Sequence, residues 1–412
     1  MTPDPDAIAD CVLATFDQLP ARCKPRPRDD GSREWVPLSG IVLAKDRELV
    51  CVSLGTGMKC LPLGKLPLAH GNVLHDWHAE VLAIRSFNRF LLEECLLLSK
   101  LPHTPSKYIQ RSANEHPEHP PFTIREDVGI YMYCSEAPCG DASMELVMES
   151  QEDSTPWTTP PPLIQQVSDS PSSEPIALRG RSHFSHLGAV RLKPSRPDAP
   201  PTLSKSCSDK LALTQATSLL SSVTSLVVSP QNAYLTVLVL PTSQLSEIGC
   251  TRAFSCFGRM SAVTSEMEQK WAGGYRWHGF NTLGTTREFE WSRRSATATQ
   301  KLVPSNISTI HTRHFQQTLI GGVLQGRKQM DARGASAICR RSMWKSALEI
   351  AMAVGISALL EIVKKASYRE VKEGSLLEAR RRVKREVRDG VLKGWVRNGR
   401  DEDFSIEDGG PK

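Results

Sequence analysis

Two histidines, an aspartate and a glutamate open the stretch HDWHAEVLAIRSF, which begins at His75. From Val81 onward the apolar residues recur at helical spacing, so these ionisable groups stand where a helix begins. Asp76 is then a candidate cap of the first helical turn. In the pair His78-x-Glu80 the imidazole can bind a metal, while the glutamate two residues later moves a proton instead of sharing the metal. Alone, such a pair is more often solvated or capping than catalytic.

A second motif strengthens the metal hypothesis. Pro138-Cys139 closes the strand-like run IYMYCSEA, 61 positions after His78. The combination H-x-E followed by P-C is the signature of zinc-dependent nucleobase deaminases. One imidazole and thiolates bind zinc tetrahedrally and leave a position open for water. A cysteine between a strand and a helix also lies near unpaired N–H groups, which favour its thiolate form.

The third metal ligand is left open by these motifs. The common pattern has a second cysteine three residues after the first, and this chain has Ala142 there. Either the site has lost its metal or another cysteine completes it. Cys134 is five residues upstream on the same strand, which puts it on the wrong side or at the wrong height. Cys207, in LSKSCSDKLAL at the opening of a helix, is the better candidate, although a cysteine can stand there incidentally.

Composition narrows the class of protein. The 412 residues carry 51 Lys+Arg against 45 Asp+Glu, a balance that allows a polyanionic partner without requiring one. The eleven cysteines are scattered, and the start MTPDPDAIADCVL has no basic leader region, so we expect a reducing, intracellular compartment. The longest apolar run, from Ser346, contains glutamates at helical spacing. It therefore predicts a buried core helix and no membrane partner.

Strand-like segments alternate with helical ones early in the chain, and basic helical segments dominate from Arg333 onward. This order predicts a single α/β domain over residues 1–400 with a helical C-terminal part. Segments rich in Pro, Ser, Thr and charge predict surface insertions at 101–122, 145–180 and 288–315. A polar tail is expected at 401–412.

Three ordered motifs carry a family resemblance: DWHAEVLAIRSF, PCGDASM and RLKPSRPDAPPTLSKSCSDKLAL. Two further matches are ASAICRRSMW from Ala335 and YREVK followed by LKGWV. Together, over roughly residues 35–400, they resemble the adenosine deaminases acting on RNA. The resemblance is closest to the tRNA-specific branch, in its fungal form, which converts adenosine 37 of alanine tRNA to inosine.

The resemblance implies a cytidine-deaminase-like zinc core, a mixed sheet flanked by helices. It implies that His78, Cys139 and Cys207 bind zinc and that Glu80 carries the proton. It also implies a buried inositol hexakisphosphate, linked to the zinc site through Asp76 and Lys210. The contacts that the motifs match are Asp76, Arg85, Lys210, Arg340, Tyr368, Lys372, Arg380 and Trp395. The basic segment by itself would instead indicate a solvated face or an RNA-contacting surface.

Some residues depart from the family pattern. The loop Lys193–Asp198 has Ser and Pro where the tRNA branch often has glycines, which leaves its geometry open. Met58 stands where many members have threonine, and LAL after Lys210 replaces an Arg-Trp pair. Ser143 stands where the double-strand editors carry arginine, which favours the tRNA branch.

The expected reaction is hydrolytic deamination of adenosine, with zinc activating the attacking water. The 77 residues before His78 leave no room for a double-stranded-RNA domain. An anticodon stem-loop, whose bases are already unstacked, is therefore the expected partner, and DNA is not. We expect the chain in the cytoplasm, the nucleus or both. The alternatives are a non-catalytic RNA-binding module with structural zinc and a deaminase of another RNA or nucleoside.

Overall fold

The computed structural model describes seven stretches of the chain. They are residues 2–101, 105–114, 116–150, 178–180, 183–193, 199–295 and 300–407. Most of the predicted 145–180 insertion and most of the altered Lys193–Asp198 loop lie outside these residues. No helix within the described ranges is long and apolar enough to span a bilayer.

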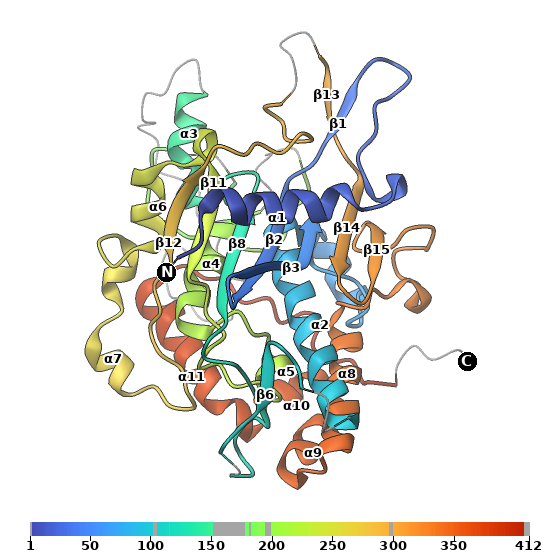
Figure 1. Cartoon of the computed structure of the whole chain (residues 1–412), viewed down its shortest axis with the longest axis vertical. Coiled ribbons are helices and arrows are strands. Elements are labelled where there is room, and N and C mark those ends of the chain that lie inside the picture. The colour runs from blue at the N-terminus through green and yellow to red at the C-terminus, as the bar shows by residue number, and fades with distance from the viewer. Residues whose placement is uncertain are drawn as a thin grey trace.

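An eight-stranded mixed sheet forms the centre of the molecule (Figure 1). Its strands in order are β12 (Asn281–Thr285), β11 (Val237–Pro241), β8 (Gly129–Cys134), β2 (Leu38–Lys45), β3 (Glu48–Thr56), β14 (Ile307–Thr312), β15 (Gln316–Ile320) and β16 (Val323–Leu324). The first three run parallel, and every later neighbour is antiparallel. A tight turn joins β2 and β3, with Asp46 and Arg47 both at positive φ.

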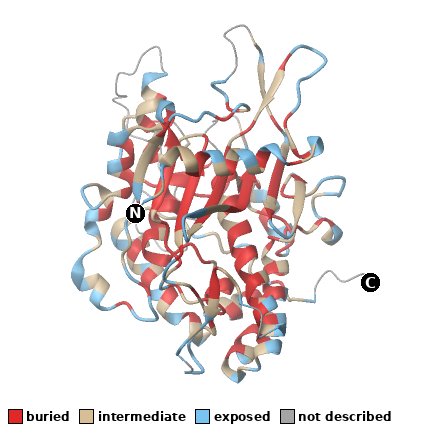
Figure 2. Cartoon of the chain, in the orientation of Figure 1, coloured by how far each residue is buried: buried red, intermediate tan, exposed pale blue. Residues whose placement is uncertain are grey.

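Helices cover both faces of this sheet because its strands are apolar on both sides. Along β2, Ile41 and Leu43 pack with the long helix α2 (Ala79–Lys100), whereas Val42 faces the opposite core, which includes α1 (Pro5–Asp17). Figure 2 shows the resulting layer of buried strands between partly exposed helices. The prediction of a mixed sheet flanked by helices is confirmed.

A C-terminal group of helices packs beside α2 and below the sheet in the view of Figure 1. The group consists of α8 (Arg340–Val354), α9 (Ser357–Val363), α10 (Tyr368–Glu373) and α11 (Glu378–Glu386), followed by a π-helical turn at Val387–Val391. The apolar run from Ser346 forms two helices instead of the single one predicted, because Gly355 ends α8 in the left-handed conformation.

Three predicted boundaries differ from the structure. The insertion predicted at 288–315 contains β14, a strand of the main sheet. The loop predicted at 101–122 contains β6 (Ile109–Arg111) and the first residue of β7 (Phe122–Ile124). The polar tail predicted from 401 is wrong up to Phe404, since Asp401 and Phe404 are buried. Phe404 stacks on Tyr368 with ring centroids 5.0 Å apart.

Candidate active site and basic cavity

Two cysteines that lie far apart in the sequence meet at the ends of a strand and a helix. Cys139 follows β8, and Cys207 is the first residue of α4 (Cys207–Thr217). The backbone N–H of Cys207 donates to Cys139 Sγ over 3.3 Å. A hydrogen bond from the Cys207 side chain holds the pKa of the Cys139 thiol well below its usual range against the effect of burial, helped by Lys193, His78 and this backbone bond. Burial and the neighbouring Cys139 raise the pKa of Cys207. The pair thus favours one thiolate even without a metal.

His78 immediately precedes α2 and lies near enough to act on the pKa of Cys139, but its Nδ1 is engaged by other groups. Its Nδ1 lies 2.9 Å from Asp76 Oδ1 and 3.6 Å from Cys60 Sγ. Burial and Lys193 lower the pKa of His78, but Asp76 and Cys60 outweigh them and raise it to about 10. A metal ion bound by this imidazole must therefore displace its proton.

Asp76 does not cap α2, contrary to the prediction. Its Oδ1 accepts from the backbone N–H of His78 over 3.0 Å, within the short strand β5 (Asp76–His78). Its Oδ2 accepts from Lys193 Nζ over 2.8 Å and from Ser204 Oγ over 2.6 Å, and also pairs with Lys210 Nζ. Against the effect of burial, the two lysines hold the pKa of Asp76 well below its usual range.

Lys193 joins the two halves of the site and was not among the predicted site residues. Its ammonium group lies 3.1 Å from Cys207 Sγ as well as 2.8 Å from Asp76. A continuous path of side chains thus runs from Cys207 through Lys193 and Asp76 to Lys210. Nothing in the local sequence distinguishes Lys193 from a surface lysine, apart from its place in the family-like motif RLKPSRPD.

Glu80 is buried in the first turn of α2. Burial and the charge of Cys139 raise the pKa of its carboxyl group. Lys193 and His78 lower this pKa and so offset part of the increase. A carboxyl group with a raised pKa can both accept and return a proton near neutral pH. The other cysteine considered as a ligand, Cys134, has a different partner. The hydroxyl group of Ser39 donates a hydrogen bond to its sulfur over 3.2 Å.

Cys139, Cys207 and His78 are of the residue types that bind zinc. In catalytic sites zinc can be bound by two sulfurs and an imidazole, with a fourth position open. The structure brings Cys139 and Cys207 together and leaves the His78 ring turned toward Asp76. Across the residues described, the only three candidate ligands with donor atoms within 4.8 Å of one another are Cys60, Asp76 and His78. We assign no metal to that group, because Asp76 already neutralises two lysines that would repel a cation.

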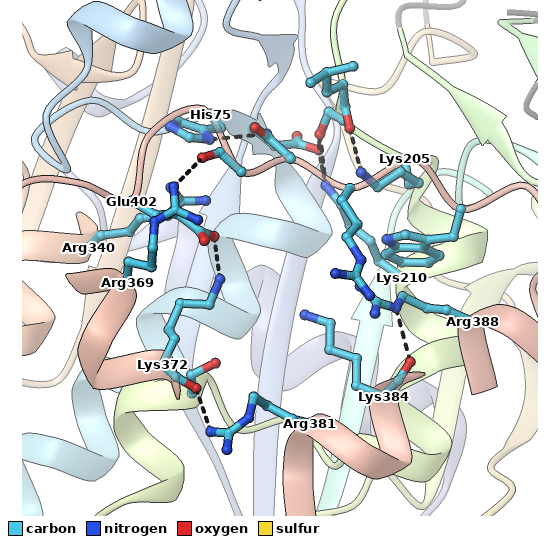
Figure 3. A pocket seen from close by; sticks show the side chains of 18 of the residues that line it. His75, Lys205, Lys210, Arg340, Arg369, Lys372, Arg381, Lys384, Arg388 and Glu402 are labelled. Atoms are coloured by element: carbon cyan, nitrogen blue, oxygen red, sulfur yellow. Dashed lines mark hydrogen bonds and ion pairs between the residues drawn. The ribbon is translucent and has the colours of Figure 1, made fainter. Parts of the chain in front are cut away.

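A basic cavity of about 510 Å³ begins on the other side of Asp76 (Figure 3). Twelve lysines and arginines line it, against three carboxylates. Seven of the eight predicted polyphosphate contacts are in its wall: Asp76, Arg85, Lys210, Arg340, Lys372, Arg380 and Trp395. Tyr368 is not. It packs behind the wall, 6.0 Å beneath the Arg340 guanidinium.

Seven cations of this wall were not predicted: Lys205, Arg369, Arg381, Lys384, Arg385, Arg388 and Arg397. A usable signal existed for part of this set, because Arg380, Lys384 and Arg388 recur every four residues and so share one helix face. Lys205 is buried between the carbonyls of Leu203 and Val396. Burial and the neighbouring Lys210 lower the pKa of Lys205 to about 7.

The cavity therefore concentrates positive charge that the protein leaves largely uncompensated. Buried cations are costly without anionic partners, and clustered lysines and arginines bind phosphate groups well. The Nε of Arg380 has no hydrogen-bond partner in the described part of the chain. The cavity thus fits a small polyanion.

Comparison with known proteins gives a consistent result. Residues 53–399 match the family model described as adenosine-deaminase (editase) domain. The chain is 35% identical over 401 residues to tRNA-specific adenosine deaminase 1 of Schizosaccharomyces pombe, which covers 96% of this chain and 95% of that protein. It is 36% identical over 220 residues to the Saccharomyces cerevisiae protein of the same name. This match covers 52% of this chain and 53% of that protein. With the double-stranded RNA-specific adenosine deaminase of Mus musculus, 36% identity extends over 109 residues, 26% of this chain and 9% of that protein.

Proposed function

The chain belongs to the adenosine-deaminase (editase) domain family, and we propose that it is a zinc-dependent enzyme that converts adenosine to inosine in tRNA. The observation that carries this proposal is the burial of Glu80 beside Cys139 and His78, which act on its pKa. A carboxyl group in this position has no role in a closed structural zinc site, so it favours the enzyme over a non-catalytic RNA-binding module. The proposed core is cytidine-deaminase-like.

In the proposed mechanism His78, Cys139 and Cys207 would hold zinc, and the bound ion would lower the pKa of the water that attacks C6 of adenine. Glu80 takes one proton from the attacking water and passes it to N1. It then takes the second proton from the new hydroxyl group at C6 and passes it to the leaving amine, and its burial keeps both protons from bulk water. The ammonium group of Lys193 donates a hydrogen bond to Cys207 Sγ and so places a positive charge beside this sulfur. It also donates to Asp76 and holds that carboxylate in place. Inosine and ammonia are the products.

Two relatives named as tRNA-specific support tRNA as the substrate. We propose the anticodon stem-loop, with adenosine 37 of alanine tRNA as the target, because flipping an unpaired base costs little. We further propose that inositol hexakisphosphate fills the basic cavity, since its phosphate oxygens can pair with the many inward cations. Such a tRNA substrate implies that the enzyme acts in the cytoplasm, the nucleus or both.

The test is to incubate the purified protein with alanine tRNA and, separately, with free adenosine. We expect inosine at position 37 of the tRNA, located by sequencing, and no turnover of the nucleoside. Deamination of free adenosine alone would contradict the proposed substrate. Absence of any deamination by zinc-loaded protein would favour the RNA-binding alternative.

A further inference from the structure

Among the described residues, three cations of the basic cavity make no hydrogen bond or ion pair through their side chains: Lys384, Arg385 and Arg397. Lys384 differs from the other two because it is partly buried, whereas they are exposed. The residue lies on α11, one turn from Arg380 and one turn from Arg388. Figure 3 shows its side chain pointing away from the helix into the cavity. In the part of the chain that the structure describes, its Nζ makes neither a hydrogen bond nor an ion pair.

The other inward cations of this segment are already engaged by the backbone. Arg380 donates to the carbonyl of Thr217 over 2.6 Å and also to that of Leu220. Arg381 donates to the carbonyls of Lys372 and Gly374 over 2.8 and 2.6 Å. Arg388 donates from Nε to the carbonyl of Lys384 itself over 3.1 Å. Their guanidinium groups are held in place, whereas Lys384 keeps all three of its donors available.

The charged groups that act most strongly on Lys384 are all cations. Burial lowers the pKa of Lys384 well below its usual range, and Arg380, Lys372, Arg388 and Lys205 add to this effect. The side chain nevertheless stays partly accessible, as expected for a group that faces a cavity. A cation among four others is unfavourable unless an anion joins them.

Helix α4, which packs against α11, adds no further cation beyond Lys210 at this point. After Lys210, the next residues of α4 are Leu211, Ala212 and Leu213, all buried in the apolar core. Near Lys384 the positive charge therefore comes from α11 and the turn after it, together with Lys372 and Lys205.

On this geometry we propose that Lys384 is a direct anchor of the polyphosphate, binding it through its unpaired ammonium group. The proposal rests on the polyphosphate occupant given under the proposed function and adds a residue that no motif matched. Lys384 would act as a point charge on phosphate oxygens, while the backbone-held arginines around it shape the site.

The experiment measures ligand retention instead of activity. Wild-type protein and Lys384→Met, which keeps length without charge, are purified, and bound inositol hexakisphosphate is quantified by phosphorus analysis and mass spectrometry. The quantification is repeated over time after transfer to high salt. We expect Lys384→Met to release the ligand roughly tenfold faster or more, the usual effect of losing a hydrogen bond to a charged group.

Arg382→Met is the matched control, because Arg382 lies on the exposed side of the same helix and pairs with Glu386 over 3.1 Å. It should release the ligand at the wild-type rate. A wild-type rate for Lys384→Met would overturn the Lys384 assignment and leave the proposed function standing. Wild-type protein without any inositol phosphate would overturn both.

A second variant covers the case in which Lys384→Met does not fold. Lys384→Arg keeps the charge and should remain soluble with its ligand bound. Loss of the ligand from a soluble Lys384→Arg protein, or insolubility of both variants, would contradict a role based on charge.

Discussion

Lys193 donates from Nζ to Asp76 Oδ2 over 2.8 Å, and both side chains are buried. The same carboxylate pairs with Lys210, which lines the basic cavity. Asp76 therefore holds one lysine beside the cysteine pair and another at the basic cavity. This arrangement couples the electrostatics of the two sites through a single side chain.

Replacing Asp76 by asparagine should destabilise the protein strongly, because two lysines lose their counter-charge and Lys193 remains buried. Loss of one partner of a buried ion pair typically costs about 3–5 kcal/mol. Chemical denaturation followed by tryptophan fluorescence measures the change. The control is Asp127→Asn, which removes the exposed ion pair with Lys45 at 2.9 Å and should cost less than about 1 kcal/mol. Equal effects of the two changes would contradict the buried network.

Glu80→Gln tests the assigned proton carrier. The amide cannot take up a proton, so the rate of inosine formation should fall by about 100-fold or more. Zinc content should stay at the wild-type level, because Glu80 is not a proposed ligand, and the melting temperature should not drop. Glu93→Gln, on the same helix and paired with Arg89 over 2.7 Å, should leave the rate unchanged. A Glu80→Gln enzyme with normal activity would refute the mechanism.

The parts of this site that could be predicted were those with a local pattern. The apolar spacing after Val81 predicted α2. The helix-opening motif made Cys207 only a candidate, and its pairing with Cys139 was implied by the family resemblance. The contribution of Lys193 could not be predicted by such means, because a lysine followed by proline has no periodic partner. Its role depends on Asp76, 117 residues away in the sequence.

Burial of polar segments was the other point at which local patterns failed. Composition at 401–412 predicted a tail, yet Asp401 is buried because it accepts from the backbone N–H of Gly71 and pairs with His75. The four-residue spacing of Arg380, Lys384 and Arg388 places them on one helix face, but it does not say whether that face meets water or a cavity. Only the packing of α11 against α4 decides that, and packing of this kind depends on the whole fold.

Zinc content separates the two candidate cysteines. Cys207→Ser should lower the zinc bound per chain, because a hydroxyl group is a poor substitute for a thiolate ligand. Cys134→Ser should not, because the Cys134 sulfur is occupied by Ser39. Elemental analysis of both purified variants measures this directly. Zinc loss from Cys134→Ser with normal content in Cys207→Ser would reassign the ligand.

Stability should fall in acid through His75. Burial, with Arg340, lowers the pKa of His75 from 6.5 to about 4, although Asp401 opposes the shift. The unfolded chain therefore binds more protons between these two values, so stability decreases as the pH falls from 6.5 toward 4, by about 3 kcal/mol in total. Denaturation at a series of pH values should show a shallower slope for His75→Gln. The exposed His119→Gln should retain the wild-type slope, and an unchanged slope in His75→Gln would exclude this origin.

Phe404 tests whether the chain beyond residue 400 is part of the folded core. The side chain is 1% exposed, and its ring also lies 6.1 Å from that of Trp344. Phe404→Ala should therefore cost about 3–5 kcal/mol, the usual range for removing a buried aromatic ring. Phe257→Ala, at a side chain that is 90% exposed, should change stability by less than about 0.5 kcal/mol. Because Phe404 stacks on Tyr368 behind the cavity wall, its loss should also speed release of the polyphosphate. A Phe404→Ala protein as stable as Phe257→Ala would show that residues 401–407 are a dispensable tail.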